Sequence, residues 1–143
     1  DRVKAEDALS LLSLPMNPSE RIARLKASKR SKLLRINNWL VALSHVSAYQ
    51  ASAARAMTAL GVHVAVVAGQ HGDKIQISMR ASREFYEKTG VHLGRDIAKP
   101  LGEYLQGMGG GHSVSAGVNG VGDIKPSLKR CARLLKEKLT QTE

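Results

Sequence analysis

The segment GMGGGHSVSAG, residues 107–117, combines closely spaced glycines with one histidine. Successive glycines can adopt positive φ angles and turn several N–H groups toward one point, an arrangement that binds anions. A phosphate could approach such a backbone closely, and the His112 ring adds a donor that is a cation when protonated. Spacing alone leaves a second interpretation open, a flexible connector between a helix and a strand. The candidate anion-binding residues here are Gly109, Gly110, Gly111 and His112.

A second candidate for anion binding is Arg80, in the segment SMRAS at residues 78–82. The alternation of apolar and polar residues over 75–79 predicts a half-buried strand, which puts Arg80 on its polar face. Ser82 then opens a predicted helix, whose first N–H groups could join the guanidinium and the hydroxyl around a phosphate. The alternative is a surface arginine followed by an ordinary serine cap.

Known catalytic motifs are missing from the chain. The sequence contains no GxSxG, HExxH, P-loop or CxxC, and its five histidines lack metal-ligand spacing. Its single cysteine cannot form an internal disulfide, which favours a reducing, cytoplasmic location. We therefore expect no catalytic residue, metal or cofactor in this chain, and no membrane association.

The net charge of +10 is concentrated at the two ends of the chain. Residues 1–38 carry a net charge of +5, residues 39–123 carry +1, and residues 124–143 carry +4. Two basic ends favour a polyanionic partner such as nucleic acid. The alternative is that the lysine-rich helix faces are simply solvated.

The elements expected around these motifs form an α/β domain with a mixed β-sheet and packed helices, preceded by a helical linker arm. The arm covers residues 1–38, with a helix that restarts at Asn17-Pro18 and runs to about Asn37. The domain covers residues 39–143. Its expected order is a strand at 39–43, a helix capped by Ser47, a hairpin over 62–79, a helix after Ser82, a helix at 96–106, a strand at 114–118 and a basic terminal helix.

The motif SMRAS, followed by GMGGGHSVSAG, a strand and a basic helix, resembles the DHH-associated domain of DHH phosphoesterases, of an archaeal-like type. That family includes RecJ-type single-strand exonucleases and the oligoribonucleases called nanoRNases. The resemblance covers residues 39–143. It implies a missing N-terminal DHH catalytic domain that binds Mn²⁺ or Mg²⁺, since this chain has no Asp-His-His and begins at Asp1. By resemblance, substrate phosphates are bound by Arg80, Ser82, Gly109, Gly110, Gly111 and His112.

The resemblance implies a substrate-binding domain that grips single-stranded nucleic acid or a short oligonucleotide and is inactive alone. Two alternatives stay open. The leucines and isoleucines of residues 1–38 could serve an oligomerisation or protein-interaction module, including a homodimer. A related domain ends alanyl-tRNA synthetases, which would make the chain an RNA-binding domain. The low aromatic content of 3% argues against extended base-stacking surfaces.

Overall fold

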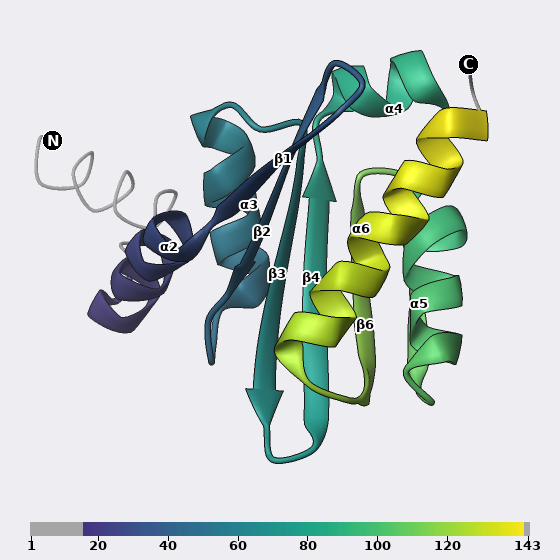
Figure 1. Cartoon of the computed structure of the whole chain (residues 1–143). Coiled ribbons are helices and arrows are strands. Elements are labelled where there is room, and N and C mark those ends of the chain that lie inside the picture. Colours follow the sequence, from purple (N-terminus) through teal and green to yellow (C-terminus); the bar gives the residue numbers. More distant parts are fainter. Residues whose placement is uncertain (1–15, 142–143) are drawn as a thin grey trace, which may run out of the picture.

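A six-stranded mixed sheet forms the centre of the computed structural model, which describes residues 16–141 (Figure 1). The strand order is β1-β2-β3-β4-β6-β5. Strands β2 and β3 are parallel, and every other neighbouring pair of the described sheet is antiparallel. The predicted α/β class with a mixed sheet is therefore confirmed. The strands are β1 (Lys32–Ile36), β2 (Trp39–His45), β3 (Val64–His71), β4 (Lys74–Ala81), β5 (Met108–Gly111) and β6 (Ser115–Val121).

Helices cover the two faces of the sheet unequally. The larger core lies on the face packed by α4 (Arg83–Thr89), the π-helix η1 (Leu93–Ala98), α5 (Lys99–Tyr104) and α6 (Ile124–Gln141). The smaller core lies on the opposite face, under α2 (Pro18–Arg30) and α3 (Gln50–Leu60). Figure 1 shows α6 crossing one face while α3 lies on the other. Within residues 16–141, no helix combines the length and apolar character needed to cross a membrane.

The strand β1 replaces the last turns of the helix expected up to Asn37. Helix α2 ends at Arg30, and residues 32–36 pair antiparallel with β2. The turn that joins them includes Asn37 at a φ of 55°, a conformation that asparagine tolerates well. The helical prediction is wrong for residues 32–36, because pairing with a neighbouring strand outweighs the local helical pattern. The helix expected within residues 1–15 lies outside the described residues, and the domain boundary at residue 38 stays a prediction.

Helix α2 is anchored to the sheet rather than extended away from it. Its Ala23 and Ala27 are buried, and the buried Ser44 hydroxyl of β2 donates a hydrogen bond of 2.6 Å to the Ala27 carbonyl. The predicted cap at Asn17 is confirmed, because its side chain accepts from the Glu20 amide at 2.8 Å.

The start of α3 differs from the expected capping box at Ser47. The helix begins at Gln50, after Tyr49, which adopts a left-handed conformation and makes no side-chain cap. The prediction of Ser47 as the cap is therefore wrong, because the loop after β2 continues for two residues beyond it. The predicted helix ends at Gly61 and Gly90 are confirmed.

Candidate phosphate-binding site

Arg80 lies in β4, on the sheet face that α3 covers only in part. Its cross-strand neighbours are Ala65 of β3 and Ser115 of β6. Ala65 belongs to the small core under α3, so Arg80 shares that face and stands where the cover by α3 ends. The Arg80 side chain is half-buried and makes no hydrogen bond or ion pair with another described residue. A partly desolvated, unpaired guanidinium is suited to an anionic ligand.

A strip in which two of three neighbouring residues are glycines runs beside Arg80 toward the sheet edge. Ser78, two residues before Arg80, pairs with Gly117 of β6, which in turn pairs with Gly110 of β5. A Cβ atom added at Gly110 would meet nothing within 4 Å, and one at Gly117 would meet only the Ile77 carbonyl at 3.6 Å. This open strip, defined by Ser78, Gly110 and Gly117, would let a ligand contact the backbone directly.

The strip is bordered by polar residues that the sequence motifs did not single out. On one side of the strip Ser115 lies opposite Arg80, and on the other side Gln76 lies opposite Asn119. Gln76 and Asn119 are exposed. The period-two pattern of residues 115–119 is the sequence signal for this face, but assigning Ser115 to Arg80 requires the strand register.

The glycines expected to form a loop instead form the edge strand β5. Gly109, Gly110 and Gly111 pair with Val118, Gly117 and Ala116 of β6, so the interpretation as a flexible connector is wrong. These glycines are extended rather than gathered around one point, and among them only Gly111 has a positive φ, of 143°.

Gly109 serves the packing of η1 on β5. A Cβ atom at Gly109 would overlap the Ala98 carbonyl oxygen and lie 2.5 Å from the Ala98 carbonyl carbon. Gly94 and Gly102 face β5 just as closely, against the backbone of Gly111 and of Met108–Gly109 respectively. The glycines therefore have two roles: Gly109 allows close approach of a helix, and Gly110 leaves the opposite face open.

His112 lies at the turn between β5 and β6, at the same end of the sheet as Arg80. Its amide donates to the Ser115 carbonyl at 2.7 Å, and its own carbonyl accepts from the Gly94 amide at 3.0 Å. Because Ser115 lies between them, the backbones of Arg80 and His112 are two strand spacings apart, about 10 Å. The exposed His112 residue could therefore contact a ligand that also reaches Arg80.

Ser82 caps α4, as the simpler of its two interpretations predicts. Its hydroxyl accepts from the Phe85 amide at 3.2 Å, and its own amide donates to the His63 carbonyl. The hydroxyl proton is still available to a ligand, so a contact from Ser82 to phosphate stays a prediction.

Two ionisable side chains away from the strip, Asp96 and Cys131, are hydrogen-bonded or buried within the fold. The Asp96 carboxylate accepts from the His92 amide at 2.8 Å and from Arg95 Nε at 3.1 Å. Burial would raise the Asp96 pKa, but these bonds outweigh burial and lower it. Burial raises the pKa of the Cys131 thiol to about 12. Across residues 16–141, no three His, Cys, Asp or Glu side chains gather into a group that could hold a metal ion.

We compared the chain with protein-family models, curated proteins and solved structures. No family model matches the chain. It is 33% identical over 128 residues to an uncharacterized protein of Methanocaldococcus jannaschii, a match that covers 90% of this chain and 39% of that protein. The chain thus spans well under half the length of this relative.

The solved structures that resemble the chain include the following three. The C-Ala domain of Aquifex aeolicus alanyl-tRNA synthetase matches with a TM-score of 0.55 and 22% identity, over 76% of this chain and 98% of that domain. An exopolyphosphatase-related protein of Bacteroides fragilis matches with a TM-score of 0.64 and 13% identity, over 96% of this chain and 40% of its own. A DHH domain described as belonging to a family of ribosomal proteins has a TM-score of 0.57 and 16% identity, over 83% of this chain and 30% of its own. The chain shares their fold. At these identities the likeness establishes the architecture alone.

Proposed function

We propose that the chain is the substrate-binding domain of a DHH-family phosphoesterase, and that the open strip holds phosphates of a single-stranded nucleic acid or short oligonucleotide. The observation that carries the proposal is the half-buried Arg80, without an ion-pair partner among the described residues, beside Ser115 and the open strip. The shared fold with a DHH domain and with an exopolyphosphatase-related protein supports it.

Each part of the strip would contribute a different contact. Arg80 would bind one phosphate with two parallel hydrogen bonds, the strongest geometry available to arginine. His112 would reach a second point about 10 Å away, while Gly110 and Gly117 would let the intervening chain lie flat on the sheet. An N-terminal DHH domain holding Mn²⁺ or Mg²⁺ would supply the hydrolytic chemistry. The chain alone would bind without cleaving, and manganese-dependent hydrolysis by residues 1–143 would contradict this division of roles.

The test is binding of a fluorescent single-stranded oligonucleotide, followed by anisotropy across a salt series. Arg80→Gln should weaken binding at least about tenfold, because hydrogen bonds to charged groups contribute about 1.5–3 kcal/mol. It should also lower the slope of log K against log salt by about one. The matched control is Arg35→Gln, an exposed arginine on β1 at the opposite edge of the sheet. Equal affinities for the wild type and Arg80→Gln would refute the site.

A second candidate function is RNA binding of the kind suggested by the alanyl-tRNA synthetase neighbour. The supporting observation is that the match covers 98% of the C-Ala domain. A structured tRNA competing more strongly than a single strand of equal length would favour this candidate.

The remaining alternative is self-association through α2. Ile22 and Leu25 are 50% and 71% exposed on this helix. Light scattering at several protein concentrations tests it, because a homodimer would dissociate on dilution and a monomer would keep one mass.

A further inference from the structure

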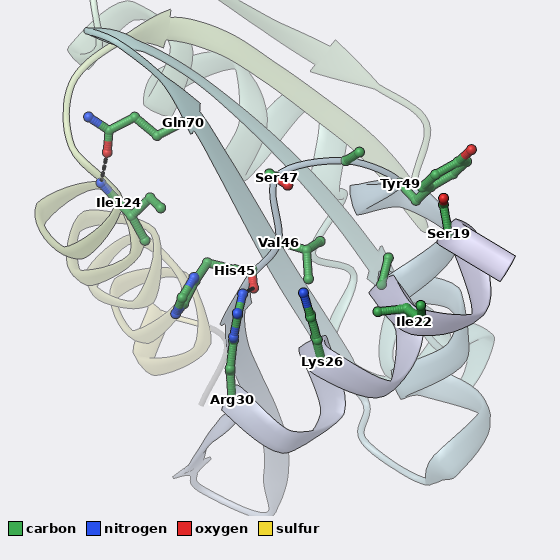
Figure 2. A pocket seen from close by; sticks show the side chains of 12 residues that line it. Ser19, Ile22, Lys26, Arg30, His45, Val46, Ser47, Tyr49, Gln70 and Ile124 are labelled. Atoms are coloured by element: carbon green, nitrogen blue, oxygen red, sulfur yellow. Dashed lines mark hydrogen bonds between the residues drawn. The ribbon is translucent and has the colours of Figure 1, made fainter.

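A second concave site lies at the far end of the sheet from Arg80. It has a cavity volume of about 560 Å³ and is lined by α2, by the loop from β2 to α3, and by the start of α6 (Figure 2). The parallel strands β2 and β3 both end here, at His45 and His71. Open α/β sheets bind ligands in the crevice outside the carboxyl ends of their parallel strands.

The pocket is basic. Lys26 and Arg30 come from successive turns of α2, and His45 comes from the end of β2. None of the described residues that line the pocket is acidic. Neither Lys26 nor Arg30 forms an ion pair with another described residue, and Arg30 Nη1 donates to the His45 carbonyl at 3.3 Å. In Figure 2 the Lys26 side chain points toward Val46, and Arg30 lies beside the His45 ring. Two such cations converging on one cavity favour an anion.

The loop that forms the facing wall holds a strained residue. Tyr49 has a φ of 61°, which is rare for a bulky side chain and costs about 1–3 kcal/mol. The surrounding contacts fix it, since Asn17 Nδ2 donates to the Tyr49 hydroxyl at 2.9 Å and the His71 ring contacts the Ser47 carbonyl at 3.0 Å. Backbone strain held in this way clusters at ligand-binding sites.

The two ends of the pocket differ chemically. Lys26 and Arg30 supply charge toward the end of α2, whereas Ile22, one turn before Lys26, and the Tyr49 ring, which are 50% and 39% exposed, supply apolar and aromatic surface near the start of the helix (Figure 2). A ligand that contacts both ends carries a phosphate and a flat, weakly polar group together. That combination describes a nucleotide, with the phosphate near the cations and the base against the aromatic ring.

We infer that this pocket binds a nucleotide through Lys26 and Arg30, at a site separate from the strip around Arg80. The two sites are far apart, because Arg80 pairs with Ala65 near the start of β3 and the pocket reaches Gln70 near its end. Five residues of strand correspond to about 17 Å. The nucleotide could be free or could be one unit of a longer strand, since both present the same phosphate and base. The inference does not depend on the proposed function of the strip.

The test is a titration of the ¹⁵N-labelled 143-residue chain with adenosine 5′-monophosphate, inorganic phosphate and a short oligothymidylate, each followed by NMR. We expect saturating amide shifts at Ser47–Tyr49, with tighter binding of the nucleotide or oligonucleotide than of phosphate. Lys26→Gln should raise the dissociation constant about tenfold, as loss of a hydrogen bond to a charged group does. Lys29→Gln is the matched control, because Lys29 is exposed on the same helix and does not line the pocket.

The separate titrations distinguish a free nucleotide from a nucleotide within a longer strand. Saturation by adenosine 5′-monophosphate identifies a free nucleotide, and shifts produced only by the oligonucleotide identify a unit within a strand; either result supports the inference. Absence of shifts at Ser47–Tyr49 with all three probes would overturn it. Equal losses in Lys26→Gln and Lys29→Gln would also overturn it, because they would indicate non-specific attraction to the basic helix.

Discussion

Gly109 and Gly110 are neighbours in β5 that should respond differently to alanine. At Gly109 the new methyl group would overlap the Ala98 carbonyl group of η1, whose backbone cannot rotate away. At Gly110 the methyl group would meet nothing within 4 Å. Neither glycine has a positive φ, so the comparison isolates packing from backbone conformation.

The expected changes in stability follow from these contacts. Overpacked cores lose about 1–3 kcal/mol. The loss of stability in Gly109→Ala should be near the upper end of this range, about 3 kcal/mol, because β5 and η1 must move apart. Gly110→Ala should be neutral or should stabilise by up to about 1 kcal/mol, because alanine restricts the unfolded chain more than glycine does. Urea unfolding followed by circular dichroism measures both changes, and the fluorescence of Trp39, which packs edge-on against Phe85, gives a second signal.

Two outcomes would refute this reasoning. A Gly109→Ala variant within about 0.5 kcal/mol of the wild type would show that η1 does not approach β5 as closely as described. Equal losses at both positions would show that the segment needs glycine for its backbone freedom, as a loop would, rather than for packing.

Three further predictions concern buried or hydrogen-bonded side chains. Asp96→Asn should destabilise the fold by about 1 kcal/mol at pH 7. Because the pKa of this carboxyl is lowered in the fold, its contribution is complete above the unfolded value of about 3.9 and is lost as the pH falls through the folded pKa. The thermal unfolding midpoints of the wild type and of Asp96→Asn should therefore approach each other as the pH falls below about 4. A difference between the midpoints that stays constant with pH would contradict this linkage. The Cys131 thiol, buried and with a pKa raised to about 12, should resist a thiol reagent at mildly alkaline pH until urea unfolds the chain; rapid labelling of the native protein would contradict its burial. Ser44→Ala should cost about 1–2 kcal/mol in urea unfolding, since it leaves the Ala27 carbonyl without its buried donor, and an unchanged midpoint would show that α2 does not depend on this bond.

Local patterns in the sequence were enough to place Arg80 correctly. The alternation of apolar and polar residues over 75–79 predicts β4 and its two faces, and Ser82 marks the helix start that follows. The cross-strand partner of Arg80, Ser115, could not be predicted, because the register of β4 with β6 depends on residues distant in the sequence.

The strands β5 and β1 were not predicted from the sequence, and the glycines of β5 show why. Strands are depleted in glycine, so local propensity argues against β5. What stabilises β5 is pairing with β6 and the close approach of η1, made possible by Gly94 and Gly102 on the facing helices. Residues 32–36 were missed for a similar reason, since they become β1 only when β2 lies beside them.

The position of β6 in the strand order has a consequence for when the proposed ligand site forms during folding. The hairpins β1–β2 and β3–β4 join segments adjacent in sequence, so they can form early. The pairing of Arg80 with Ser115 instead closes a long loop that contains η1, α5 and β5. Loop closure of that length carries a larger entropic barrier, so β6 is expected to add late. A nascent or partly folded chain would then already contain Arg80 in a hairpin while lacking the rest of the proposed strip, so binding at that strip, as proposed, would report completed folding.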